Sequence, residues 1–237
     1  MYAVAERERI IMPATDAPVD ASPRISSSMR LDKQANNLLT KYGGSDNFVP
    51  IVVPGDGNCL FHALSVCHYG NMAHTVELRV RCCIELMTQR EHYDNDDFDD
   101  VAERYEVECC DTARDGKYAG IFSIMAASTV LKRPIQSIYP PVNGMTDPAV
   151  RKLNMLALPR VATLTPAIRL MWTYKGVRMQ ATWTPNHFAP LFELAPQRET
   201  TSSPPSATRQ PPPSASSVEP DIDMTDIVSI HIREHYT

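Results

Sequence analysis

The sequence predicts an α+β (α/β) domain in which helices pack around a small, mostly sequential β-sheet. Segments with helical spacing of apolar residues come first, and most runs with strand character come last. Both ends of the chain are rich in Pro and Ser and lack periodicity, over residues 13–28 and 196–220. We therefore expect a folded domain over residues 30–195, a disordered segment 1–29 before it, the disordered linker after it, and a short motif or the start of a further region at 221–237.

The helices are predicted from apolar spacing. In residues 59–69, apolar side chains recur at i, i+3, i+4 and i+7 from Leu60. Residues 75–90 form a second predicted helix, and residues 31–42 and 118–131 two more. For the helix over 75–90 we expect the buried stripe to be Val76, Val80, Cys83, Ile84 and Met87.

Strands are predicted over five short apolar or alternating runs. They are residues 48–53, 134–139, 168–174, 177–183 and 187–194. The turn Lys175-Gly176 predicts a hairpin between the third and the fourth.

Composition and charge exclude several classes of protein. The chain is 43% hydrophobic with a formal net charge of −5, so it can bury a core and lacks the basic excess of a nucleic-acid binder. No run approaches 18 apolar residues, and the charged N-terminus lacks the apolar run of a signal peptide. We expect a monomer without nucleic-acid or membrane partners, located in the cytoplasm or nucleus and not secreted.

Six cysteines do not indicate a disulfide framework. Two pairs are adjacent in sequence, Cys82-Cys83 and Cys109-Cys110, and adjacent cysteines rarely bridge each other. The cysteines show no C-x-x-C spacing, which would have indicated a zinc site. We expect reduced thiols, no metal and no cofactor.

The strongest chemical signal is the turn that leads to Cys59. A predicted strand ends, the turn Pro54-Gly55-Asp56-Gly57-Asn58 follows, and a helix begins at the cysteine. A helix N-terminus stabilises a thiolate, and N–H groups of the turn at Gly57 and Asn58 could converge on a developing oxyanion. Cys59 is therefore a candidate nucleophile.

A thiol nucleophile needs a base, and His187 is the best candidate. It follows a turn and opens an alternating strand late in the chain, which is the order seen in papain-like proteases. His62 and His68 lie on the helix of Cys59 and fit this role less well.

These motifs resemble the OTU (ovarian tumour) family of cysteine proteases. The resemblance is carried by DGNCLFHAL at residues 56–64 and NHF at 186–188, with further likeness at 120–123 and 134–139. The compact layout is similar to OTU domains of virus- or transposon-associated proteins. The resemblance implies a papain-like fold, a ubiquitin or ubiquitin-like substrate, Cys59 as nucleophile, His187 as general base and Asp56 as the acidic residue of the active-site loop.

The chain departs from the family pattern two residues after the histidine. Many members carry Asp or Asn there to orient the ring, whereas this chain has Ala189. The orienting group would be Asp56, Asn186 or a residue that the sequence does not identify. In a strand, the Asn186 side chain would point away from that of His187.

An acidic segment, residues 91–111, carries ten acidic residues and one basic residue, a net charge of −9. It is either a solvated surface or, by the resemblance, an arm that steers a basic substrate.

The leading functional hypothesis is an active deubiquitinase. The alternatives are a catalytically weak or inactive module that binds ubiquitin or another partner, and a protease that processes a viral or transposon polyprotein.

Overall fold

The structure is a computed structural model that describes residues 27–42, 47–94, 96–176 and 183–194. All of these residues belong to the first of the two units into which the chain divides, Met1–Pro196. The predicted segments 1–29, 196–220 and 221–237 lie wholly or almost wholly outside the described residues. The domain boundaries at residues 30 and 195 stay predictions.

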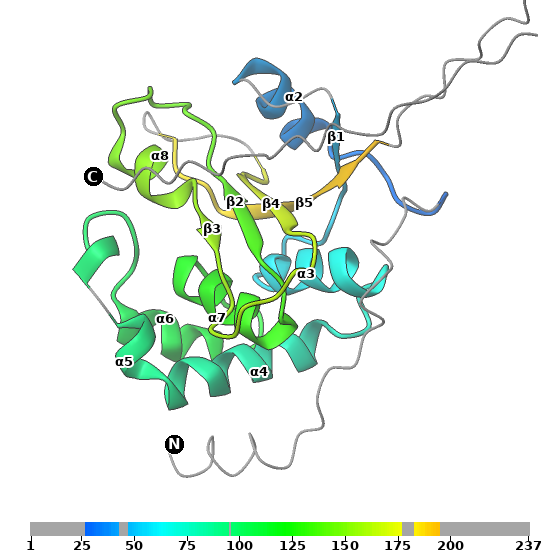
Figure 1. Ribbon diagram of the computed structural model, residues 1–237. Coiled ribbons are helices and arrows are strands. Elements are labelled where there is room, and N and C mark those ends of the chain that lie inside the picture. Colours follow the sequence, from blue (N-terminus) through cyan, green and yellow to red (C-terminus); the bar gives the residue numbers. More distant parts are fainter. Residues whose placement is uncertain (1–26, 43–46, 95, 177–182, 195–237) are drawn as a thin grey trace, which may run out of the picture. The chain divides into compact units, whose positions relative to one another are not determined.

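The described strands form one mixed sheet with the order β1-β5-β4-β2-β3 (Figure 1). Their bounds are β1 Phe48–Pro50, β2 Ile135–Ile138, β3 Leu156–Ala157, β4 Ile168–Thr173 and β5 His187–Glu193. β2 and β4 are parallel, and the other pairs are antiparallel.

The sheet is sequential in part only. Neighbours β2–β3 and β4–β5 follow each other along the described chain, whereas β1–β5 and β4–β2 do not. The predicted strand over 177–183 lies outside the described residues except for Trp183, which is in neither a helix nor a strand. The strand that pairs with β4 after Lys175-Gly176 is β5, with Thr173 opposite His187.

Helices cover the sheet, as predicted for an α+β domain (Figure 1). The helices are α2 Lys33–Lys41, α3 Cys59–Tyr69, α4 Thr75–Thr88, α5 Arg90–Tyr93, α6 Tyr105–Thr112, α7 Ile121–Leu131 and α8 Pro148–Leu153, with a 3₁₀ turn η1 at Asp96–Phe98. α3 packs against β5 and β4, and α7 packs against β2. α4 packs against α3 and α7. α3 ends at Gly70, whose φ of 77° is left-handed and costs glycine little.

The buried face of α4 differs from the predicted stripe. Val76 and Val80 are 66% and 41% exposed, so that prediction was wrong for them. The buried residues of α4 are Thr75, Leu78, Arg79, Cys82, Ile84, Glu85 and Leu86. Arg79 and Glu85 face inward although they are charged, because the fold supplies partners for them. Apolar spacing alone therefore placed the buried face of α4 wrongly.

The acidic segment holds a helix that the sequence pattern did not predict. α6 buries Tyr105, Glu108 and Thr112, so this part of the segment is built into the domain. Other members are exposed, including Asp96, Asp97, Asp99 and Asp100. Lys152 pairs with Asp100, and Arg90 pairs with Asp94 and Glu106, which offsets part of the negative charge.

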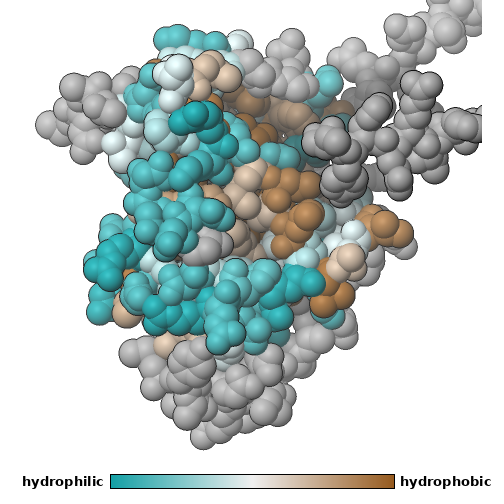
Figure 2. Space-filling view, turned by 60° about the vertical axis from the view of Figure 1, so that its left-hand side comes forward, coloured by the Kyte–Doolittle hydropathy of each residue, from teal (hydrophilic) through white to brown (hydrophobic). Residues whose placement is uncertain are grey.

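Apolar side chains also reach the surface. Figure 2 shows one face on which a hydrophobic area is bordered by hydrophilic residues. Large exposed apolar side chains in the described chain include Leu158 and Val161, at 64% and 75% exposure. Exposed apolar areas of sufficient size often serve as contact surfaces.

Candidate active site

Cys59 is the first residue of α3 and is only 1% exposed. Burial raises the pKa of its thiol above the ordinary value. Backbone N–H groups of Phe188 and Leu60 act in the opposite direction and lower it. The thiol is therefore protonated in this state, and backbone donors are already in place to stabilise a thiolate.

The turn before Cys59 requires glycine at position 57. Gly57 has a φ of +86°, and a Cβ there would lie 1.8 Å from the carbonyl oxygen of Gly116. Asn58 joins the same two segments: its Nδ2 donates to Asp115 Oδ1 at 3.0 Å, and its Oδ1 accepts from the N–H of Gly116 at 3.3 Å. The turn that carries Cys59 is thus held against residues 115–116.

Asp56 is bonded within this turn and to the helix that follows. Its Oδ1 accepts from the N–H of Asn58 at 2.9 Å, and its Oδ2 lies 3.1 Å from Nε2 of His62. Slight burial raises the pKa of Asp56, but the bonds from His62 and Asn58 outweigh this effect and the pKa falls below its ordinary value. Because Asp56 already accepts the Asn58 N–H, that group is not free for the oxyanion role expected of it.

His187 begins β5 and is 1% exposed. Among the described residues, neither of its ring nitrogens has a hydrogen-bond partner. Burial, assisted by the positive charge of Lys175, lowers its pKa from 6.5 to about 4, against smaller opposing effects of Asp32 and Asp56. The imidazole is therefore neutral near pH 7.

No hydrogen bond joins His187 to Cys59 within the described structure. The elements that carry the two residues nevertheless pack against each other: α3, which begins at Cys59, contacts β5, which begins at His187.

Asn186 bonds to the backbone of Lys175 and not to His187. Its Oδ1 accepts from the Lys175 N–H at 2.8 Å, and its Nδ2 donates to the Lys175 carbonyl at 3.3 Å. These bonds close the connection between β4 and β5. Ala189 is fully buried and projects from the same face of β5 as His187, so it cannot orient the ring by a hydrogen bond.

Comparison with known families identifies the family of the domain. A family model described as "Vertnin, OTU domain" matches residues 50–106 and 96–173, which together are more than half of the chain. The chain belongs to this OTU-domain family. The match covers the Cys59 turn, α3, α4, α6, α7 and the strands β2, β3 and β4.

Curated relatives of this OTU domain include vertnin of Ailuropoda melanoleuca, 25% identical over 202 residues, and vertnin of Danio rerio, 26% identical over 202 residues. These alignments cover 73% and 71% of this chain but 27% and 28% of the relatives. The chain thus spans about a quarter of the length of the curated relatives it matches.

Solved structures similar to this OTU domain include other OTU domains. One is the OTUD1 OTU domain, with a TM-score of 0.44, 21% identity, and coverage of 68% of this chain and 95% of that chain. Another is the Hazara virus OTU bound to ubiquitin, with a TM-score of 0.40, 16% identity, and coverage of 66% and 85%.

Arg79 organises the site of this OTU domain, although the sequence pattern did not single it out. It lies on the buried face of α4 at 4% exposure, with its guanidinium 4.6 Å from the centre of the Phe61 ring. Its two terminal nitrogens donate to five backbone carbonyls, those of Gly57, Asp111, Thr112, Arg114 and Lys117. Arg79 therefore fixes the Cys59 turn and residues 111–117 relative to each other. The one signal in the sequence was a charged residue between Leu78 and Val80.

The described part of this OTU domain offers no group of three or more His, Cys, Asp or Glu side chains arranged to hold a metal. All six cysteines lie in the described part and are free thiols. No helix among the described residues is both long and apolar enough to cross a membrane.

Proposed function

We propose that this OTU domain is a cysteine-dependent hydrolase that cleaves peptide or isopeptide bonds after ubiquitin or a ubiquitin-like protein. Cys59 is the nucleophile and His187 the general base. The observation that carries the proposal is the packing of α3, which begins at Cys59, against β5, which begins at His187. The substrate class comes from the DGNC turn and the OTU resemblance.

The reaction starts from a neutral thiol and a neutral imidazole. His187 takes the Cys59 proton, and the thiolate attacks the carbonyl carbon at the end of the ubiquitin chain. The imidazolium then gives that proton to the leaving amine as the carbon–nitrogen bond breaks, leaving a thioester on Cys59. His187 next removes a proton from water, the hydroxide attacks the thioester, and the thiol is released.

Substrate binding must bring Cys59 and His187 together for this reaction. Catalytic hydrogen bonds are often long or absent in a free enzyme and tighten only in the complex. His187 suits such a change, because its two ring nitrogens have no partners to lose among the described residues. Arg79, Gly57 and Asn58 meanwhile hold the nucleophile turn in place.

A second candidate function is a module that binds ubiquitin or a related partner without turnover. Two observations favour it: the described site has no Cys59–His187 hydrogen bond, and Ala189 stands where many OTU domains carry an orienting side chain. The raised pKa of the Cys59 thiol points the same way.

Hydrolysis of a fluorogenic C-terminal amide of ubiquitin tests the first function against the second. We expect turnover by the wild type, none by Cys59→Ala, and a rate lowered by about 100-fold or more for His187→Gln. Saturable binding of ubiquitin to wild type and Cys59→Ala alike, without turnover by either, would favour the second. We further propose that the protein acts as a monomer in the cytoplasm or nucleus, where its free thiols stay reduced.

A further inference from the structure

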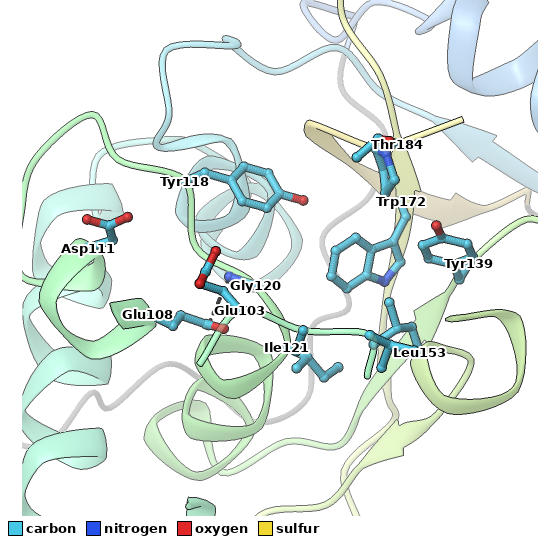
Figure 3. A pocket seen from close by; sticks show the side chains of 13 residues that line it. Glu103, Glu108, Asp111, Tyr118, Gly120, Ile121, Tyr139, Leu153, Trp172 and Thr184 are labelled. Carbon is cyan, nitrogen blue, oxygen red and sulfur yellow. Dashed lines mark hydrogen bonds between the residues drawn. The ribbon is translucent and has the colours of Figure 1, made fainter. Parts of the chain in front are cut away.

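A cavity of about 430 Å³ lies beside the candidate site, between the acidic segment and the sheet (Figure 3). Its volume falls in the range of roughly 300–1,000 Å³ that is usual for ligand pockets. One wall comes from residues 101–111, and the opposite wall includes Trp172 of β4 together with Thr184 and Pro185, which precede His187.

Aromatic rings in fixed positions line the cavity. Tyr118 stacks on Phe188, with ring centres 5.6 Å apart and planes 12° apart. Tyr139 packs on Trp172 at 5.7 Å, and the indole Nε1 of Trp172 donates to Ser137 Oγ at 2.7 Å. These contacts hold the rings without a ligand, and ring faces attract cations.

Acidic side chains line the other wall. Glu108 is 5% exposed, and its Oε1 accepts the N–H groups of Gly120 at 2.8 Å and Ser123 at 2.7 Å. Glu103 and Asp111 also line the cavity, and no basic residue does so within the described chain. Asp111 pairs with Arg114 at 3.4 Å, whereas Glu103 makes no ion pair with another described residue.

The hydroxyl of Tyr118 indicates an absent partner. Its oxygen is buried and has no hydrogen-bond partner among the described residues. Figure 3 shows this hydroxyl directed across the cavity, toward the side on which Trp172 and Tyr139 lie. A buried hydroxyl without a partner is costly, and a bound donor would remove that cost.

We propose that this cavity binds a cationic side chain of a polypeptide, with arginine the best fit. A planar guanidinium stacks on aromatic faces and has five N–H donors to offer. Glu103, Glu108 and the Tyr118 hydroxyl supply acceptors on one side of such a group, across the cavity from the rings of Trp172 and Tyr139 (Figure 3). The idea that the cavity is a subsite for a polypeptide that reaches Cys59 rests on the proposed function. The idea that the cavity binds a cation does not depend on that function.

Tryptophan fluorescence tests the proposal, because Trp172 lines the cavity and the chain has two tryptophans. The full chain carrying Cys59→Ala is titrated with Nα-acetyl-arginine N-methylamide. The matched neutral probe is the citrulline compound, and the lysine compound shows whether an ammonium replaces the guanidinium. Using Cys59→Ala keeps the result independent of any catalysis.

We expect saturable binding of the arginine probe and at least about tenfold weaker binding of the citrulline probe. Glu103→Gln and Tyr118→Phe weaken arginine binding by about two- to fivefold. Asp99→Asn, which removes an exposed charge from the same segment outside the cavity, leaves it unchanged. Saturable binding of the lysine probe also supports a cation site. Equal binding of arginine and citrulline probes, or no saturable change with either cation, overturns the proposal.

Discussion

The carboxylate of Asp56 is bonded to the ring of His62, with 3.1 Å between Oδ2 and Nε2. His62 lies one turn along α3 from Cys59, and its Nδ1 is 2.9 Å from the hydroxyl of Thr75 at the start of α4. Asp56 therefore connects the nucleophile turn with α3 and α4. In this state it influences Cys59 through the backbone of the turn and makes no hydrogen bond to His187.

Replacing Asp56 separates its acceptor role from its charge. Asp56→Ala leaves the Asn58 N–H without its acceptor and lowers the free energy of unfolding by about 1 kcal/mol. Asp56→Asn keeps an oxygen for that N–H, and because the carboxylate is half exposed, losing its charge costs less. Denaturant unfolding measures both. Equal destabilisation by the two variants would show that the acceptor role has been misassigned.

Gly57→Ala tests the close approach between the nucleophile turn and Gly116. The new Cβ meets the Gly116 carbonyl as well as a positive φ, so we expect a loss of at least about 3 kcal/mol in unfolding free energy. Gly144→Ala is the matched control, because φ there is +103° but nothing lies within 4 Å. It should cost only about 1 kcal/mol. Equal losses would rule out the clash.

Arg79→Met should be among the most damaging substitutions in α4. It removes the donor to five buried or partly buried carbonyls and should cost about 3–5 kcal/mol. Arg79→Lys should keep only part of this stability, because one ammonium cannot replace both terminal nitrogens of the guanidinium. Hydrogen exchange of residues 111–117 should rise in both variants.

Arg81→Met is the control for Arg79, since Arg81 bonds to Glu77 on the same helix. Its loss should leave hydrogen exchange of residues 111–117 at the wild-type level. If hydrogen exchange of residues 111–117 rose as much in Arg81→Met as in Arg79→Met, the inference that Arg79 organises these residues would be wrong.

The free energy of unfolding should decrease as the pH is lowered from 6.5 toward 4. Burial lowers the pKa values of His187 and His68 from 6.5 to about 4. The unfolded chain therefore binds protons near pH 6.5 while the folded chain does not, so the stabilisation is complete above pH 6.5 and is lost as pH falls toward 4. Each histidine accounts for up to about 3 kcal/mol. His187→Gln should flatten the pH dependence, and an unchanged slope would show that His187 does not titrate there.

The fold and the nucleophile turn could be predicted because their signals are local. The helix start at Cys59 follows from the turn before it, and the inward face of α3 follows from apolar spacing. The inward face of α4 could not be predicted in this way, because Arg79 and Glu85 are buried by partners from distant segments: backbone carbonyls for Arg79, and Tyr93 and Arg160 for Glu85. The same reason hid the buried carboxylate of Glu108 within a segment that resembled a solvated surface.

The partner of each site residue was also beyond the reach of the sequence. Spacing placed His187 on a strand and Asp56 in a turn, but not Asp56 against His62 or Asn186 against Lys175. The first pairing requires the turn to fold back against α3, and the second requires β4 and β5 to pair, and local patterns encode neither arrangement. The roles of Cys59, His187 and Asp56 in catalysis stay predictions.

Covalent capture by ubiquitin bearing a C-terminal electrophile tests the Cys59 chemistry most directly. The wild-type chain and Cys59→Ala are incubated with this probe near neutral pH, and intact mass is measured. We predict that the wild type gains the mass of one ubiquitin and that Cys59→Ala gains none. A wild-type chain that stays unmodified, or a Cys59→Ala chain that is modified to the same extent, would contradict Cys59 as the nucleophile of a ubiquitin-directed hydrolase.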